Sequence, residues 1–162
     1  MNKRLAITFG VGVVAIAIAI LAILYMQRGA HIELKGAILK IRTAPMDANS
    51  SVGVIDFRFD NPANYPFVVR TVDVIVEDKQ GNRYLGSPVP EVDAKRLFEF
   101  YPLLGQKYHD SLLSRDKIKP RTSEDRMIAA RFELPEAKLE SRKRFIVRIE
   151  DVDGPISEIS EK

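Results

Sequence analysis

The chain has 162 residues, no cysteine, and nearly balanced charges, with 25 basic and 22 acidic residues. This length fits one domain with an appendage. The absence of cysteine excludes a disulfide framework, a thiol nucleophile and a cysteine-based zinc site. Basic and acidic residues are interleaved along the chain, so the net charge of +3 does not indicate a nucleic-acid-binding protein, which would gather its basic residues on one face.

The N-terminal segment is apolar enough to predict a membrane anchor. Residues 5–26 carry no charge, and a helix of this length spans about 33 Å, enough for a hydrocarbon core of about 30 Å. A cleaved signal peptide is the rival interpretation, but its apolar region is usually shorter and ends in a small-residue cleavage site. We therefore expect a transmembrane helix over 5–26, a tail of residues 1–4 and a short tether of residues 27–31.

Basic residues lie on both sides of this segment, so the positive charges on its two sides favour opposite orientations in the membrane. Lys3 and Arg4 favour a cytoplasmic N-terminus, whereas Arg28 and Lys35 argue for the reverse. A short basic tail is hard to carry across a membrane. We expect a single-pass protein of the cell membrane that contacts the bilayer through 5–26. Its tail is then cytoplasmic and its β domain extracytoplasmic.

From residue 32 onward the apolar pattern changes to a period of two, which predicts β-strands. Gly36 interrupts the first run, where we expect a β-bulge. About seven strands at these spacings predict a mainly β domain over 32–162, an antiparallel immunoglobulin-like sandwich, with a barrel as the alternative. The strands are expected over residues 32–43, 52–60, 67–78, 83–85, 126–134 and 145–149, with a frayed edge at 156–159 and a helical turn at 136–141.

Residues 86–118 interrupt the strand pattern and are expected to form an insertion with a short helix at 91–100. Large apolar side chains are too frequent here for a solvated loop, so the insertion either packs on the sheet or presents a surface. The candidate partner surface consists of Leu97, Phe98, Tyr101, Leu103, Leu104, Tyr108, Leu112 and Leu113.

Three short stretches carry a resemblance to a known fold. Residues 57–66 form a strand closed by Asn-Pro, residues 78–84 read Asp-Lys-Gln-Gly-Asn-Arg-Tyr, and residues 132–135 read Phe-Glu-Leu-Pro. This pattern resembles the immunoglobulin-like sandwich of the late-embryogenesis-abundant water-stress (WHy) domain. It equally resembles the immunoglobulin-like domains of small exported bacterial proteins. The resemblance covers residues 50–152 and implies a non-enzymatic module, but it names no ligand.

The sequence predicts neither a catalytic nor a metal site. His31 and His109 have no carboxylate at ligand spacing and are expected at the surface. Asp56 and Asp60 share one strand face, for which a polar outer face is favoured over acid–base catalysis. Residues 150–154 contain only part of a calcium loop. We therefore expect no enzymatic activity, cofactor, metal, nucleic acid or small-molecule substrate.

The expected function is that of a membrane-anchored, non-catalytic immunoglobulin-like module. It would bind or scaffold a protein partner at the membrane surface, for example as an accessory subunit of a membrane complex. Two alternatives stay open. One is a stress-protective domain of the water-stress type, and the other is an accessory to an enzyme or transporter whose site a partner completes.

Overall fold

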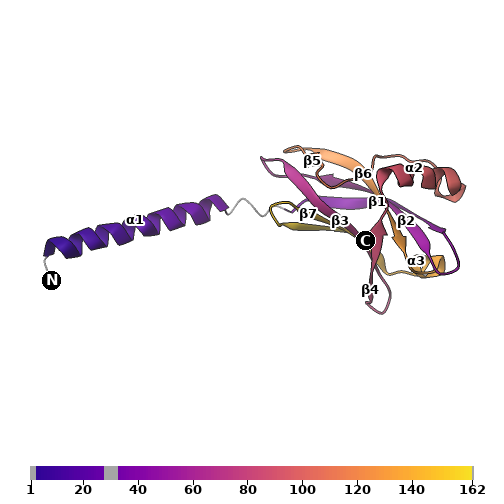
Figure 1. Ribbon diagram of the computed structural model, residues 1–162, viewed down its shortest axis with the longest axis horizontal. Coiled ribbons are helices and arrows are strands. Elements are labelled where there is room, and N and C mark those ends of the chain that lie inside the picture. The colour runs from indigo at the N-terminus through magenta and orange to yellow at the C-terminus, as the bar shows by residue number, and fades with distance from the viewer. Residues whose placement is uncertain (1–2, 28–32, 162) are drawn as a thin grey trace. The chain divides into compact units, whose positions relative to one another are not determined.

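The computed structural model describes residues 3–27 and 33–161, and within the first stretch it describes the side chains of residues 9–25. The chain divides into two compact units, residues 1–32 and 33–162, which we treat separately (Figure 1). The predicted tail and tether fall mostly outside the described residues, as does His31.

The first unit contains one helix, α1 (Lys3–Gln27), which agrees with the helix expected over residues 5–26. Within the residues that the structure describes, no helix is both long enough and apolar enough to cross a membrane. The membrane span and its orientation stay predictions.

The second unit is mainly β, as predicted. The strands expected over 52–60, 67–78 and 145–149 are present, together with the helix over 91–100 and the helical turn near 136–141. The elements of this unit are β1 (Lys35–Pro45), β2 (Ser51–Asp60), β3 (Phe67–Glu77), β4 (Arg83–Pro88), α2 (Glu91–Phe100), the 3-10 helix η1 (Pro102–Leu104), β5 (Lys117–Ile118), β6 (Ser123–Phe132), α3 (Glu136–Glu140), β7 (Arg144–Asp151) and β8 (Ile156–Ser160).

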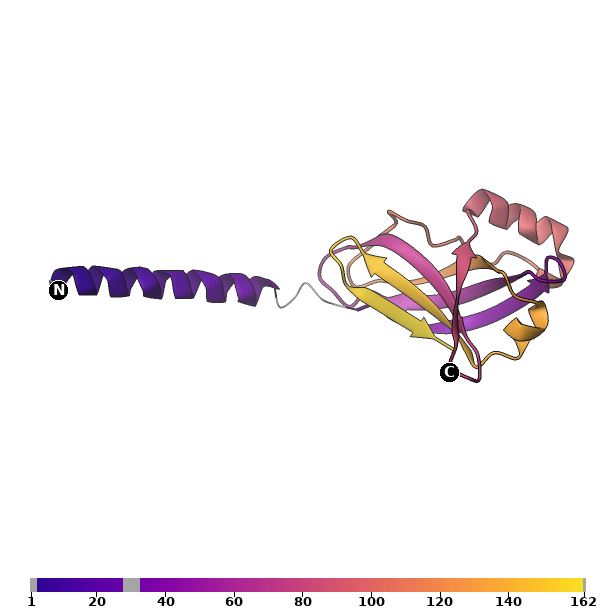
Figure 2. The ribbon, with the colours of Figure 1, turned by 60° about the horizontal axis from the view of Figure 1, so that its bottom comes forward.

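The strands form a single antiparallel sheet in the order β1-β2-β6-β4-β3-β7-β8, and β5 pairs with β3 off this path. Strand β4 changes neighbours along its length, because Arg83–Gly86 pair with β3 and Ser87–Pro88 pair with β6. The two ends of the path, β1 and β8, come together, since the Leu34 amide donates to Ser157 Oγ at 2.8 Å. The sheet is therefore nearly closed into a barrel (Figure 2).

The nearly closed barrel differs from the two-sheet sandwich that the strand spacing predicted and is nearer to the barrel alternative. The antiparallel, mainly β class is confirmed, but β4 pairs with strands on both sides and joins what would otherwise be two separate sheets. The barrel interior is filled by the inward side chains of alternating residues, led by the fully buried Phe57, Phe59, Phe132 and Phe145. Burial of each such side chain stabilises the fold by about 1.5–3 kcal/mol.

The bulge of β1 lies at Leu39 rather than at Gly36, where the sequence predicted it. The pairing with β2 shifts register between Ile38 and Lys40, whereas Gly36 pairs in register with Phe59. A glycine is required at position 36 because β1 passes close to two neighbours there. A Cβ at this position would overlap the carbonyl oxygen of Arg58 and lie 2.7 Å from Ile159 Cδ1.

We expect Gly36→Ala to lower the free energy of unfolding by about 1–3 kcal/mol, because the overlapping backbone oxygen cannot turn away. Urea unfolding of the full chain in detergent micelles measures this. The neighbouring Ala37 is exposed, so Ala37→Ser should change stability by no more than about 0.5 kcal/mol. A Gly36→Ala protein as stable as the parent would contradict the close approach of the Arg58 carbonyl oxygen on β2 to position 36.

Glu77, at the end of β3, is the buried acidic centre of a basic cluster. Its carboxylate lies 2.7 Å from Lys143 Nζ, 2.9 Å from Arg144 Nη2 and 3.4 Å from Arg83 Nε. Hydrogen bonds from Lys143 and Arg144 lower the pKa of Glu77 from 4.5 to about 2. Because the folded-state pKa is the lower one, the ionised carboxylate stabilises the fold above pH 4.5. That stabilisation is lost as the pH falls towards 2.

Replacement of Glu77 by glutamine is therefore expected to destabilise the protein at pH 7, with a difference from the parent that shrinks between pH 4.5 and pH 2. Urea midpoints of both proteins across this range test the expectation. A difference that stays constant down to pH 2 would show that the carboxylate's charge is not responsible.

Candidate functional site

The insertion between β4 and β6 covers the outer face of β1, β2 and β6. Helix α2 starts directly after Pro90, and Glu91 and Asp93 in its first turn complement the positive end of the helix dipole. Its buried side chains, Ala94 and Leu97, belong to a second apolar cluster, separate from the barrel core. The cluster comprises Ala44, Val52, Val54, Ala94, Leu97, Leu104, Met127 and Ala129. This part of the sheet is thus covered on both faces, and α2 lies on its outer side (Figure 1).

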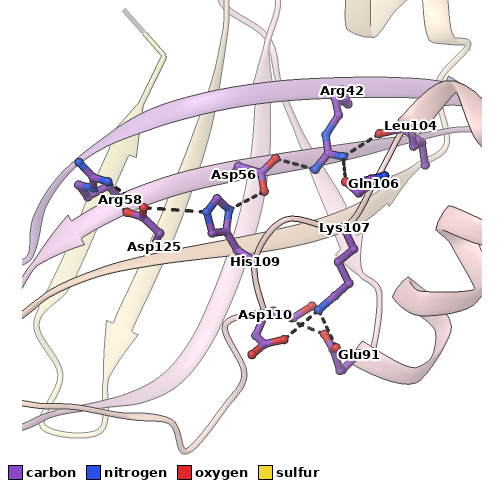
Figure 3. Close-up of polar contacts among 11 residues, drawn as sticks. Arg42, Asp56, Arg58, Glu91, Leu104, Gln106, Lys107, His109, Asp110 and Asp125 are labelled. Carbon is purple, nitrogen blue, oxygen red and sulfur yellow. Dashed lines mark hydrogen bonds and ion pairs between the residues drawn. The ribbon is translucent and has the colours of Figure 1, made fainter.

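Beside this cluster, the outer face of the sheet carries a buried ion pair. Asp56 of β2 is 2% exposed, and its Oδ2 accepts a hydrogen bond of 2.6 Å from Arg42 Nη2 of β1. Arg42 Nη1 donates to the carbonyl oxygens of Leu104 and Gln106, at 2.7 and 2.6 Å. One guanidinium therefore binds the strand carboxylate and the insertion backbone together (Figure 3).

His109 adds a second connection between the insertion and the sheet. Its Nδ1 lies 3.1 Å from Oδ1 of Asp56, and its Nε2 lies 3.9 Å from Oδ2 of Asp125 on β6. Asp125 in turn accepts two hydrogen bonds from Arg58, at 2.6 and 2.8 Å. These bonds lower the pKa of Asp125 by more than its burial raises it. The imidazole thus sits between two carboxylates, each of which also binds an arginine (Figure 3).

A third connection ties the first turn of α2 to the segment that follows η1. Lys107 Nζ lies 2.8 Å from Glu91 Oε1 and 3.2 Å from Asp110 Oδ1. Burial would raise the pKa of Glu91, but hydrogen bonds from Lys107 and from the side chain and amide of Ser111 leave it lowered. Glu91 therefore stays charged near neutral pH. We call the contacts of Arg42, Asp56, Lys107 and His109 the insertion clamp.

The clamp corrects two predictions. Asp56 is not part of a polar outer face, because the insertion covers that face; Asp60, further along β2, is exposed as expected. His109 was expected at the surface, because the sequence places no carboxylate at ligand spacing from it. Its side chain is 28% exposed, and it contacts Asp56. Sequence spacing missed this group because Arg42, Asp56, His109 and Asp125 come from four separate elements.

The structure separates the predicted partner surface into different environments. Leu97 and Leu104 are buried between the insertion and the sheet, in the second apolar cluster, and Leu112 is buried in the barrel core. Phe98 and Tyr101 are half-buried beside the second cluster. The exposed members are Leu103 at 84%, Tyr108 at 56% and Leu113 at 41%. The use of these residues by a partner stays a prediction.

Two exposed apolar residues escaped the sequence analysis. Phe100 is 77% exposed and Val92 is 64% exposed. Together with Arg96 they follow helical spacing along the outer side of α2, and this spacing could have revealed them. We call Val92, Arg96, Phe100 and Leu103 the α2–η1 surface.

A groove of about 450 Å³ runs beside this surface. Its apolar lining includes Met46, Leu97 and Phe100, and its rim carries Arg96 and Arg131. Each arginine has an ion-pair partner at the surface, Asp93 at 3.8 Å for Arg96 and Glu133 at 3.2 Å for Arg131, and Arg131 also lies near enough to Asp47 to help lower the pKa of that carboxyl. Exposed pairs of this kind hold their side chains weakly, so both arginines are accessible to a further anion.

The chemistry of the clamp is that of a structural connection. Both carboxylate oxygens of Asp56 are already engaged, one by Arg42 and one by His109. Across residues 3–27 and 33–161, no three acidic, histidine or cysteine side chains are grouped so that they could hold a metal ion.

Comparisons with protein-family models, curated proteins and solved structures find no match for the chain.

Proposed function

We propose that this chain is a membrane-anchored, non-catalytic binding module that presents its α2–η1 surface to a protein partner. The observation that carries the proposal is the exposure of Phe100 and Leu103, at 77% and 84%, on an insertion that buried polar contacts fix to the sheet. A rigidly held apolar surface of this kind favours binding, because little conformational entropy is lost when a partner docks.

The strand order supports an immunoglobulin-like module. Strands β1, β2 and β6 are neighbours, and so are β3, β7 and β8. Without the short β5, these are the first, second and fifth strands and the third, sixth and seventh strands along the chain. Immunoglobulin-type sandwiches divide their strands between two sheets in this way. Closure through β4 then distinguishes this chain from a plain sandwich.

The anchor rests on the composition of residues 5–26, which contain no charge over a length of about 33 Å as a helix. The side chains of residues 9–25 are exposed in α1, and nearly all of them are apolar. Such a helix needs an apolar environment around all of its faces. The bilayer supplies that environment, and Lys3, Arg4 and Arg28 flank the apolar stretch at positions where headgroups would lie.

The partner is expected to present apolar side chains next to carboxylates. Phe100 and Leu103 offer the apolar contact, and Arg96 and Arg131 place positive charge at the groove rim. Aromatic and arginine side chains contribute most strongly to binding in protein interfaces. The buried side chains of α2 belong to the same cluster as Ala44 and Val52, which lie at the end of β1 and β2 opposite to Lys35. The partner therefore contacts the end of the domain remote from residue 33.

Co-purification from detergent-solubilised native membranes tests the proposal. The tagged full chain should retain one dominant partner, and Leu103→Glu or Phe100→Glu should reduce its recovery at least tenfold. Leu85→Glu is the matched control, because Leu85 is 68% exposed and does not belong to the α2–η1 surface. Equal recovery with all variants would contradict the proposal. A diffuse set of clients that no variant changes would favour the stress-protective alternative.

A further inference from the structure

Strand β3 has an interrupted edge on the side opposite to β7. Phe67 and Val68 pair with β5 on this side, and Val74–Glu77 pair with β4. Between them, the Arg115 amide donates to the Val69 carbonyl oxygen, and Ser114 Oγ donates to the Arg70 carbonyl oxygen, both at 2.7 Å. No strand among residues 33–161 pairs with Thr71–Asp73 on this side. A short unpaired strand edge is therefore left between β4 and β5.

A cleft of about 410 Å³ lies along this edge and is lined by residues 70–73, 88–90, 111–114 and Ile128. Its floor is apolar, because Val72, Leu112 and Ile128 belong to the barrel core and are 8%, 2% and 4% exposed. We call it the β3 cleft. Its position follows from the departure of β4, which leaves β3 after Gly86 in order to pair with β6.

The β3 cleft is lined by two polar side chains with different surroundings. Ser111 is 6% exposed, and its hydroxyl lies beside the Glu91 carboxylate, whose pKa it helps to lower. Among the described residues, Asp73 has no side-chain hydrogen bond or ion pair. Arg148 stands opposite Asp73 on β7, but its guanidinium binds Glu158 at 2.7 Å. The carboxylate of Asp73 is therefore the polar group in the β3 cleft that a ligand can pair with.

We propose that the β3 cleft binds an extended segment of another protein as a short added strand. The backbone of the segment pairs with Thr71–Asp73, an apolar side chain rests on the Val72–Leu112–Ile128 floor, and a basic side chain lies beside Asp73. Addition of a strand to an open sheet edge takes its affinity from main-chain hydrogen bonds and its specificity from side-chain pockets. The carboxylate of Asp73 argues against a fatty acid or an anionic lipid.

This site is independent of the α2–η1 surface. The β3 cleft contains no residue of the α2–η1 surface, although Val89 lines both the cleft and the groove beside that surface. The groove is lined by Arg96 and Arg131, whereas the cleft holds Asp73 and an arginine, Arg70, that already binds Glu150 at 3.0 Å. Leu112 and Leu113, two members of the predicted partner surface, belong to the β3 cleft. Loss of binding at one site therefore says nothing about the other.

Defined synthetic peptides test the proposal on the full chain in detergent micelles. The probe is a nine-residue peptide of alternating threonine and valine, with leucine at its centre and lysine on each side of the leucine. A second peptide replaces both lysines by glutamate, and a third keeps the sequence but carries N-methyl groups on alternate amides. Fluorescence anisotropy gives the affinities. We expect the lysine peptide to bind at least tenfold more tightly than either of the others.

Two variants assign the binding to the β3 cleft. Asp73→Asn should weaken the lysine peptide about fivefold, which corresponds to one partly exposed ion pair. Leu113→Lys should weaken it further, because it adds repulsion at the cleft mouth. Asp60→Asn is the control, since Asp60 is exposed on β2 outside the cleft.

Three results would overturn the proposal: equal binding of all three peptides, no binding of any peptide, or an affinity for the lysine peptide that Asp73→Asn leaves unchanged. So would occupation of the cleft by a second copy, detected as concentration-dependent self-association that Leu113→Lys abolishes.

Discussion

Replacement of Asp56 by leucine is expected to lower the free energy of unfolding by about 3–5 kcal/mol, the usual cost of removing one partner of a buried ion pair. Arg42 would stay buried, because its side chain is 7% exposed and Phe98 and Tyr108 stack against it, with ring centroids 5.1 and 5.2 Å from the guanidinium carbon. The guanidinium would then lack an anion. Urea unfolding of the full chain in detergent micelles measures the loss.

The double variant Arg42→Met with Asp56→Leu is the informative comparison. Removal of both charges leaves no unpaired ion, so this protein should recover most of the lost stability. Asp60→Asn, on the exposed part of the same strand, should stay within about 0.5 kcal/mol of the parent. If Asp56→Leu alone is as stable as the parent, the insertion clamp does not hold the insertion to the sheet.

Replacement of Ile16 by arginine is expected to release the chain from membranes. Ile16 lies at the middle of residues 5–26, and an arginine at the centre of a membrane helix costs about 2.5–3.5 kcal/mol of insertion free energy. Carbonate extraction of native membranes, followed by detection of the full chain in pellet and supernatant, measures retention. The parent and Ile16→Leu should stay in the pellet, and Ile16→Arg should move to the supernatant.

The anchor proposal is wrong if carbonate extracts the parent chain as well. Orientation is tested separately by a reporter fused after Lys162 that is active only in the cytoplasm. We expect this reporter to be silent, because the basic tail favours a cytoplasmic N-terminus and places the β domain on the other side.

The sequence predicted the positions of strands and helices better than it predicted which faces of the sheet other segments cover. The alternation of Ile55, Phe57 and Phe59 identified the barrel-facing side of β2, and the flanking prolines and apolar spacing located α2 and α3. Alternation states only which side a residue faces. It could not show that an insertion some forty residues later covers the opposite side, so Asp56 was assigned to solvent.

The insertion clamp and the closure of the barrel could not be predicted from local sequence patterns either, because both depend on contacts between segments far apart in the chain. His109 meets Asp56 across 53 positions of sequence, and such a contact leaves no spacing signal. The choice between sandwich and barrel depends on β4, a strand of six residues whose two pairings cannot be seen in its own sequence. At Gly36, the glycine signalled a special backbone position, but the close approach of the Arg58 carbonyl oxygen on β2 and of Ile159 on β8 explains it, and a bulge does not.

Photo-crosslinking in intact native membranes tests the central claim most directly. A benzophenone amino acid would replace Leu103 in the full chain, and in a second protein it would replace Leu85, which is also exposed but lies outside the α2–η1 surface. We predict one dominant crosslinked protein from position 103, lost when Arg96 and Arg131 are also changed to glutamate, and none of that product from position 85. The same products from both positions, or no product from position 103, would contradict the account.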